Sequence, residues 1–106
     1  MNQLPELRIG DNVIPLPIIQ GGMGVGVSLS GLASAVANEG GIGVIASAGI
    51  GTFHFDWDQG TMSLMDLDRE GLRLEIRKAR SLTKGWIGVN IMAALNDFSS
   101  LLRVAL

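Results

Sequence analysis

The 106-residue sequence contains no cysteine, only 5% aromatic residues and no strongly basic segment. The absence of cysteine excludes a disulfide framework, thiolate metal ligands and a thiol nucleophile, and it is typical of a protein in a reducing cytoplasm. The chain has eight Lys and Arg residues and ten Asp and Glu residues, which gives a net charge of -2. The basic residues form no patch interleaved with aromatics. We therefore expect a cytoplasmic location and no nucleic-acid partner.

Charge is also missing from residues 12–38, which raises the question of a membrane span. Pro15, Pro17, Gln20 and several glycines interrupt this stretch, so no apolar segment of roughly 18 residues remains. The amino terminus has no basic stretch ahead of an apolar run, unlike a secretory signal. A buried strand followed by a buried helix is the better interpretation, and we expect no membrane association.

Apolar residues make up 47% of the chain, and they alternate between two patterns. Short continuous runs predict buried strands at residues 18–20, 42–46 and 86–91. Apolar residues at helical spacing predict a helix after the first strand and a second helix from about residue 68 to residue 83. This order implies parallel strands joined by right-handed crossovers.

The expected helix ends are marked by polar residues and glycines. Ser28 or Ser30 is the predicted N-cap of the first helix, and Gly40 with Gly41 supplies a left-handed stop. Asn96 or Asp97 caps a third helix, whose apolar face continues to the last residue without a stop signal. The pattern therefore predicts an amino-terminal part of a larger protein.

Four glycines follow the first strand within the sequence Gln-Gly-Gly-Met-Gly-Val-Gly (20–26). Glycine at the carboxyl end of a strand lets a flat or phosphorylated ligand approach the main chain. The dinucleotide fingerprint fails here, because its third glycine would have to stand at Val27 or Leu29. The acid expected after the second strand is also absent, since Ser47 occupies that place.

Three blocks of sequence carry a family resemblance: Pro-Ile-Ile-Gln-Gly-Gly-Met-Gly (17–24), Ala-Asn-Glu-Gly-Gly-Ile-Gly-Val-Ile-Ala-Ser (37–47) and Gly-Val-Asn-Ile-Met (88–92). Together they resemble the nitronate monooxygenase (2-nitropropane dioxygenase) family, whose members are FMN enzymes on a TIM (β/α)8 barrel. The family is closely similar to the FMN-dependent enoyl-acyl carrier protein reductases. A complete barrel needs about 250 residues, so the resemblance implies an α/β chain with about three βα units, all of it (1–106) the amino-terminal part of one FMN-binding barrel domain.

The resemblance also implies a cofactor site. Gly22, Met23 and Gly24 would contact the isoalloxazine ring, and Asn90 would face it. An asparagine in an apolar strand is costly to bury unless its amide finds partners, which a ligand or the neighbouring backbone can supply. Candidate cofactor-binding residues are Gln20, Gly22, Met23, Gly24, Ser47 and Asn90.

Residues 47–71 are predicted to be an irregular insertion that covers part of the barrel mouth. His54 stands there with Asp56 and Asp58 at alternate positions, but no second His or Cys accompanies it. We interpret it as a surface-loop histidine and expect no metal site. The similar enzymes carry their catalytic histidine on a later strand, so no catalytic residue is assigned.

Two reactions and one alternative class remain open. The first is oxidation of alkyl nitronates or nitroalkanes with oxygen, and the second is reduction of an enoyl thioester with NAD(P)H; both would use FMN and a small-molecule substrate. A non-catalytic binding or scaffold module is the third, and the open-ended last helix argues against it. Unpaired sheet edges would favour self-association.

Overall fold

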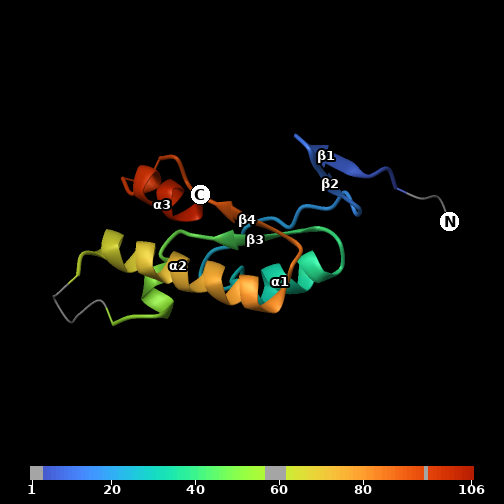
Figure 1. Ribbon diagram of the computed structural model, residues 1–106. Coiled ribbons are helices and arrows are strands. Elements are labelled where there is room, and N and C mark those ends of the chain that lie inside the picture. Colours follow the sequence, from blue (N-terminus) through green and yellow to red (C-terminus); the bar gives the residue numbers. More distant parts are fainter. Residues whose placement is uncertain (1–3, 57–61, 95) are drawn as a thin grey trace.

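The computed structural model describes residues 4–56, 62–94 and 96–106. These residues form a small α/β structure with two two-stranded sheets and three α-helices (Figure 1). None of the described helices is both long and apolar enough to cross a membrane. The combination of strands and helices confirms the α/β class.

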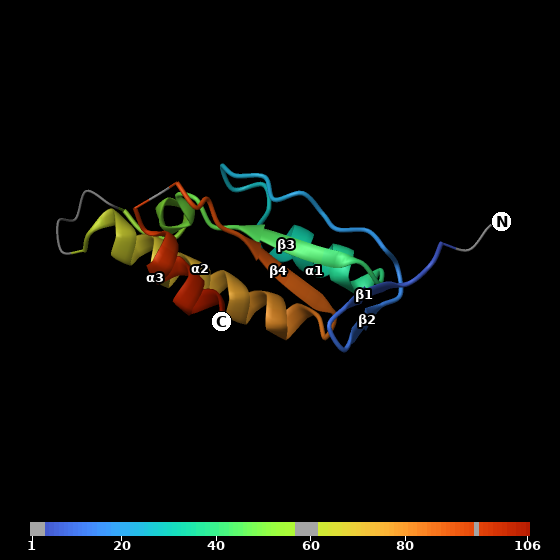
Figure 2. The ribbon, with the colours of Figure 1, turned by 90° about the horizontal axis from the view of Figure 1, so that it is seen from above.

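The first sheet is an antiparallel hairpin of β1 (Leu7–Ile9) and β2 (Asn12–Ile14). Its turn contains Gly10, whose φ of +59° suits glycine. The sequence pattern did not predict this hairpin, because strands of three residues are too short to show a clear alternation. It lies at one end of the molecule (Figure 2).

The second sheet pairs β3 (Ile42–Ala46) and β4 (Trp86–Asn90) in parallel, from Ile42 opposite Trp86 to Ala46 opposite Asn90. Both strands match their predicted positions closely. The predicted strand at residues 18–20 also lies parallel to β3, but as a single bridge between Ile19 and Ile42. The backbone pairing ends there because the Gln20 side chain, and not the backbone beyond it, bonds to the Val44 N–H and carbonyl.

Three helices accompany these strands: α1 (Ser30–Asn38), α2 (Leu64–Leu82) and α3 (Phe98–Ala105). Helices α1 and α2 lie on the same side of the β3–β4 pair (Figure 1), and α1 packs against both β3 and α2. Helix α3 packs against α2. The fully buried side chains of Ala33, Ile45, Leu72, Ala79 and Leu101 form the centre of this core.

Two predicted helix starts are corrected. Leu29, not Ser28 or Ser30, occupies the N-cap position of α1, and no side chain of its own segment caps it. Helix α2 begins at Leu64 instead of residue 68, because the Ser63 hydroxyl accepts the Asp66 N–H at 3.1 Å. The predicted stop of α1 is confirmed, since Gly40 has a φ of +98°.

The segment 47–71 is more regular than predicted. It contains a 3₁₀ helix, η1 (Ile50–Phe53), and the first residues of α2. Ile50 is fully buried in the core, and a Cβ on Gly51 would lie 2.3 Å from the backbone of Leu67. Part of this segment therefore packs into the domain. Its residues 57–61 lie outside the described part of the chain.

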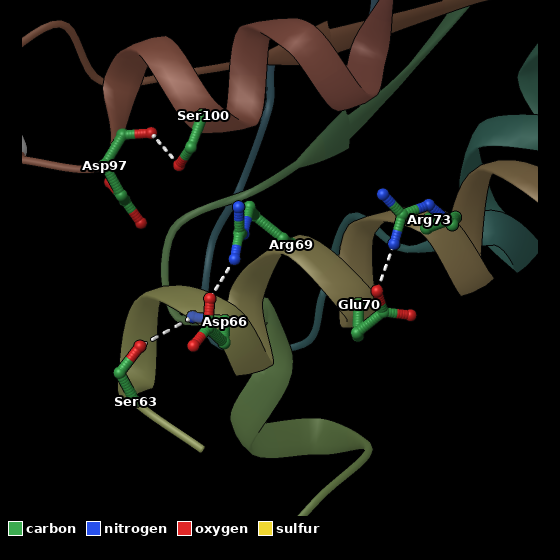
Figure 3. A network of polar contacts seen from close by, with 7 residues as sticks. All are labelled: Ser63, Asp66, Arg69, Glu70, Arg73, Asp97 and Ser100. Carbon is green, nitrogen blue, oxygen red and sulfur yellow. Dashed lines mark hydrogen bonds and ion pairs between the residues drawn. The ribbon is translucent and has the colours of Figure 1, made fainter.

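A network of polar contacts follows the exposed side of α2 (Figure 3). Arg69 pairs with Asp66, and Arg73 pairs with Glu70, one helical turn apart. The hydrogen bond from the Ser63 hydroxyl holds the pKa of Asp66 below its ordinary value, and Arg69 lowers it further. No predicted site residue belongs to this network, which we interpret as helix stabilisation.

Candidate functional site

The carboxyl ends of β3 and β4 lie side by side and are joined by hydrogen bonds. Asn90 ends β4, and Ser47 follows β3 directly. Ser47 donates to the Asn90 carbonyl oxygen from both its backbone N–H, at 3.1 Å, and its hydroxyl, at 2.8 Å. Because Ser47 is fully buried, these two bonds fix the backbone of Asn90 at the end of its strand.

Gly22 lies directly against the Asn90 side chain. A Cβ atom on Gly22 would be only 2.6 Å from the Asn90 Cβ, so this approach requires glycine. Asn90 is exposed, and among the described residues its side-chain amide has no hydrogen-bond partner. The amide is therefore available to a ligand.

Gln20 joins the first predicted strand to β3 through its side chain. Its Nε2 donates to the Val44 carbonyl at 3.1 Å, and its Oε1 accepts the Val44 N–H at 3.2 Å. The same Nε2 donates to the Ser28 hydroxyl at 2.9 Å. The Gln20 amide is thus engaged with the protein, where it fixes the base of the glycine-rich loop.

Residues 23–28 form a closed turn beyond Gln20. The Met23 N–H donates to the Ser28 hydroxyl at 2.9 Å, and the Ser28 N–H donates to the Met23 carbonyl at 3.0 Å. Val25, at the tip, has a φ of +51°, which is strained for a β-branched residue. Such strain persists only where the surrounding structure imposes it, and it is common at ligand sites.

Two glycines of the loop are not explained by the protein itself. Among the described residues, no atom lies within 4 Å of a Cβ placed on Gly21 or Gly24, and neither residue has a left-handed φ. The side chain of Met23, between them, is 49% exposed. The free chain therefore leaves open space beside the backbone at Gly21 and Gly24.

A cavity of about 420 Å³ borders this site, with Ala48 and Met92 in its lining. Asp68 and Asp97 also line it, and both are buried. Burial raises the pKa of Asp68 and the nearby Asp97 carboxylate raises it further, although the Gly51 N–H donates to Asp68 Oδ1 at 2.8 Å. Asp97 Oδ1 has no hydrogen-bond partner in the described part of the chain.

The structure brings together Gly22, Ser47 and Asn90, and it places Met23 next to them on the exposed loop. Gln20 lies at the base of the same loop with its amide turned to the protein. Contact of these residues with a cofactor stays a prediction.

The sequence did not predict the contacts of three polar residues near the loop, Ser28, His54 and Glu75. Ser28 closes the turn instead of capping α1. His54 lies in an exposed turn, as predicted, but its Nε2 lies 3.2 Å from Glu75 Oε1 and its side chain is only 24% exposed. A contact between residues this far apart in the sequence has no local signal. Among the described residues, no group of three His, Cys, Asp or Glu side chains is placed to hold a metal ion.

Comparison with known proteins adds an independent finding. The family model for nitronate monooxygenase matches residues 7–102, which include the hairpin, the glycine-rich loop, α1, α2 and the first part of α3. Comparison with curated protein sequences finds no match. Because the family model covers nearly the whole sequence, the chain belongs to the nitronate monooxygenase family.

Proposed function

We propose that the glycine-rich loop and the carboxyl ends of β3 and β4 bind the isoalloxazine ring of FMN in a flavin-dependent oxidoreductase. The observation that carries this proposal is the open space at Gly21 and Gly24. Neither packing nor backbone conformation in the free chain calls for glycine at these positions. A flat ring resting on the main chain does, because a Cβ would occupy its place.

The residues present fit such a ring in distinct ways. The backbone at Gly22 and the Gly24 N–H offer polar groups, whereas the Gly24 carbonyl already accepts the Val27 N–H. The exposed side chain of Met23 offers an apolar surface. The Asn90 amide, which has no partner among the residues that the structure describes, can both donate to and accept from the polar edge of the ring. Ser47 and Gln20 would act by holding Asn90 and the loop in place.

We further propose that residues 18–20, β3 and β4 are the first three strands of a (β/α)8 barrel. They lie parallel and in chain order, with α1 and α2 between them in sequence and on one side in space (Figure 1). Active sites of barrel enzymes lie at the carboxyl ends of the strands. The convergence of Gly22, Ser47 and Asn90 at that end supports this arrangement.

The reaction that family membership favours is oxidation of an alkyl nitronate with oxygen. Bound FMN would supply the electron transfer, taking electrons from the substrate and passing them to oxygen. The chain's own contribution would be to hold the ring through the loop and Asn90, while the cavity beside Ala48 and Met92 offers room for the apolar part of a small substrate.

The test is oxygen consumption by the complete barrel protein proposed above, purified and supplied with FMN and ethyl nitronate. The chain alone would contribute about three of the eight βα units, and we expect it to be inactive. We expect uptake that depends on FMN and that falls in Asn90→Ala, since the substitution removes up to two hydrogen bonds of about 0.5 to 1.5 kcal/mol each. A protein that binds no FMN would contradict the proposal. Rapid anaerobic reduction of the flavin by NADH or NADPH, without nitronate turnover, would instead favour an enoyl-thioester reductase.

A further inference from the structure

Helix α1 is capped by a residue from another helix. Its N-cap position holds Leu29, and its first turn has no acid. Instead, Glu75 from α2 accepts the Ser30 N–H through Oε2 at 2.9 Å, and only 3% of Glu75 is exposed. A carboxylate at a helix N-terminus satisfies a free N–H and interacts favourably with the helix dipole. The start of α1 is therefore held from α2.

The second oxygen of the same carboxylate holds the end of η1. Glu75 Oε1 lies 3.2 Å from Nε2 of His54, the residue that ends η1. Burial opposes ionisation of Glu75, yet the hydrogen bond from Ser30 and the proximity of His54 keep the pKa of Glu75 below its ordinary value. The charged carboxylate thus links α1, α2 and η1.

Both segments held by Glu75 contact the glycine-rich loop. Ser30 lies just beyond Ser28, whose hydroxyl closes the turn at residues 23–28. Phe53, next to His54, packs on Gly26: a Cβ there would lie 3.0 Å from the Phe53 ring. The loop is therefore supported at its end and at its side.

We propose that Glu75 and His54 are positioning residues that hold residues 23–28 in the shape that presents Gly24 to FMN. The identification of the ligand as FMN rests on the proposed function. The support of the loop by Glu75 and His54 follows from the contacts within the chain. The two parts can be tested separately.

The support is tested by amide hydrogen exchange without flavin. We expect Glu75→Gln and His54→Phe to speed exchange at Met23 and Ser28 about tenfold, while amides in β3 change little. His54→Gln should restore slow exchange, because its side-chain amide can still donate to Glu75. Glu70→Gln, an exposed change on the same helix, is the matched control.

Unchanged exchange at Met23 and Ser28 in the variants, or an equal increase throughout β3, would contradict the claim that Glu75 and His54 support the loop. Should Glu75→Gln fail to fold, the pair His54→Phe and His54→Gln gives the same comparison with the buried carboxylate intact. Failure of His54→Gln to restore slow exchange would also count against it.

The positioning role is tested by FMN titration, followed by flavin fluorescence. We expect the Kd to rise about five- to tenfold in Glu75→Gln and His54→Phe, and to remain near the unmodified value in His54→Gln and Glu70→Gln. Faster amide exchange in the loop together with an unchanged Kd for FMN would contradict the positioning role of Glu75 and His54. If the unmodified protein binds no FMN, the proposed function and the positioning role both fail, while the exchange experiment still decides on the support.

Discussion

Glycines in two regions of this molecule have different causes. At the contact between α1 and β3, a Cβ on Gly43 would lie 1.8 Å from the Ala33 carbonyl oxygen. In the loop after residue 20, a Cβ on Gly21 or Gly24 would meet nothing within 4 Å in the part of the chain that the structure describes. Packing of the free chain explains the first region completely. Packing does not explain the glycines of the second region, which points to a ligand beside Gly21 and Gly24.

The two regions also differ in how their backbones are held. The β3–β4 pair has continuous parallel pairing and packs against α1. The loop instead depends on a few side chains, chiefly Ser28 and Gln20, and it contains the strained Val25. A rigid scaffold that carries a separately held loop is the usual arrangement for a binding site. Substitutions should therefore affect stability in the first region and ligand affinity in the second.

The largest effect is expected from Gly43→Ala. The new methyl group would overlap the α1 backbone, so we expect the free energy of unfolding to fall by about 3 kcal/mol or more. Gly31→Ala is the matched control, because Gly31 lies in α1 with open space around it, and the change should stabilise by about 0.5 to 1 kcal/mol. Chemical denaturation measures both. Similar stability of the two variants would remove the basis of the comparison.

Gly24→Ala should show the opposite pattern. Open space at Gly24 predicts a change in the free energy of unfolding within about 0.5 kcal/mol. The methyl group should nevertheless raise the Kd for FMN about tenfold, since it would stand between the backbone and the ring. Denaturation and flavin titration of one preparation give both values. An unchanged Kd would show that the open space serves another purpose.

A smaller effect is expected from Val25→Gly. Relief of the left-handed backbone gains roughly 1 to 2 kcal/mol, and the greater freedom of glycine in the unfolded chain offsets about 0.5 to 1 kcal/mol of it. The variant should thus be slightly more stable by denaturation. Val27→Gly, also exposed but without a left-handed φ, should be less stable than the unmodified protein. The strain at Val25 would be refuted if both variants lost stability equally.

The smallest effect concerns pH and Asp68. Burial, together with Asp97, raises the pKa of Asp68 above 3.8, so the folded chain keeps this proton to higher pH than the unfolded chain. The free energy of unfolding then falls as the pH rises from near 3.8 through the raised pKa, and Asp68→Asn avoids this loss. The variant should gain stability over the unmodified protein as the pH rises through that interval.

Asp66→Asn provides the control of opposite sign. The hydrogen bond from Ser63 lowers the pKa of Asp66, so its ionised form stabilises the fold above the ordinary value of 3.8. This variant should lose stability relative to the unmodified protein as the pH rises. Parallel pH dependences in the two variants would contradict the assigned shifts.

Local sequence signals account for much of the fold. The runs that form β3 and β4 are mostly apolar and are each preceded by a glycine, and the stop of α1 needs the left-handed Gly40. Apolar spacing predicts the start of α2 too late, because the cap formed by Ser63 and Asp66 lies ahead of the clearly periodic residues. The hairpin of β1 and β2 is too short for its alternation to stand out.

The candidate site also contains residues that the sequence predicts and residues whose roles it does not predict. Gly22, Ser47 and Asn90 could be predicted together because each follows or ends a parallel strand, and such ends meet at one edge of the sheet. The roles of Glu75 and His54 could not, since they arise only when α2 packs against the start of α1. Tertiary contacts of this kind leave no periodic trace in the sequence.

The central claim is that FMN binds at the loop and at Asn90. Titration of isotope-labelled protein with FMN, followed through its amide NMR signals, tests it most directly. The account predicts saturable shifts that are largest at Gly21, Gly24 and the side-chain amide of Asn90. Absence of saturable shifts, or shifts confined to the cavity around Asp68 and Asp97, would contradict it.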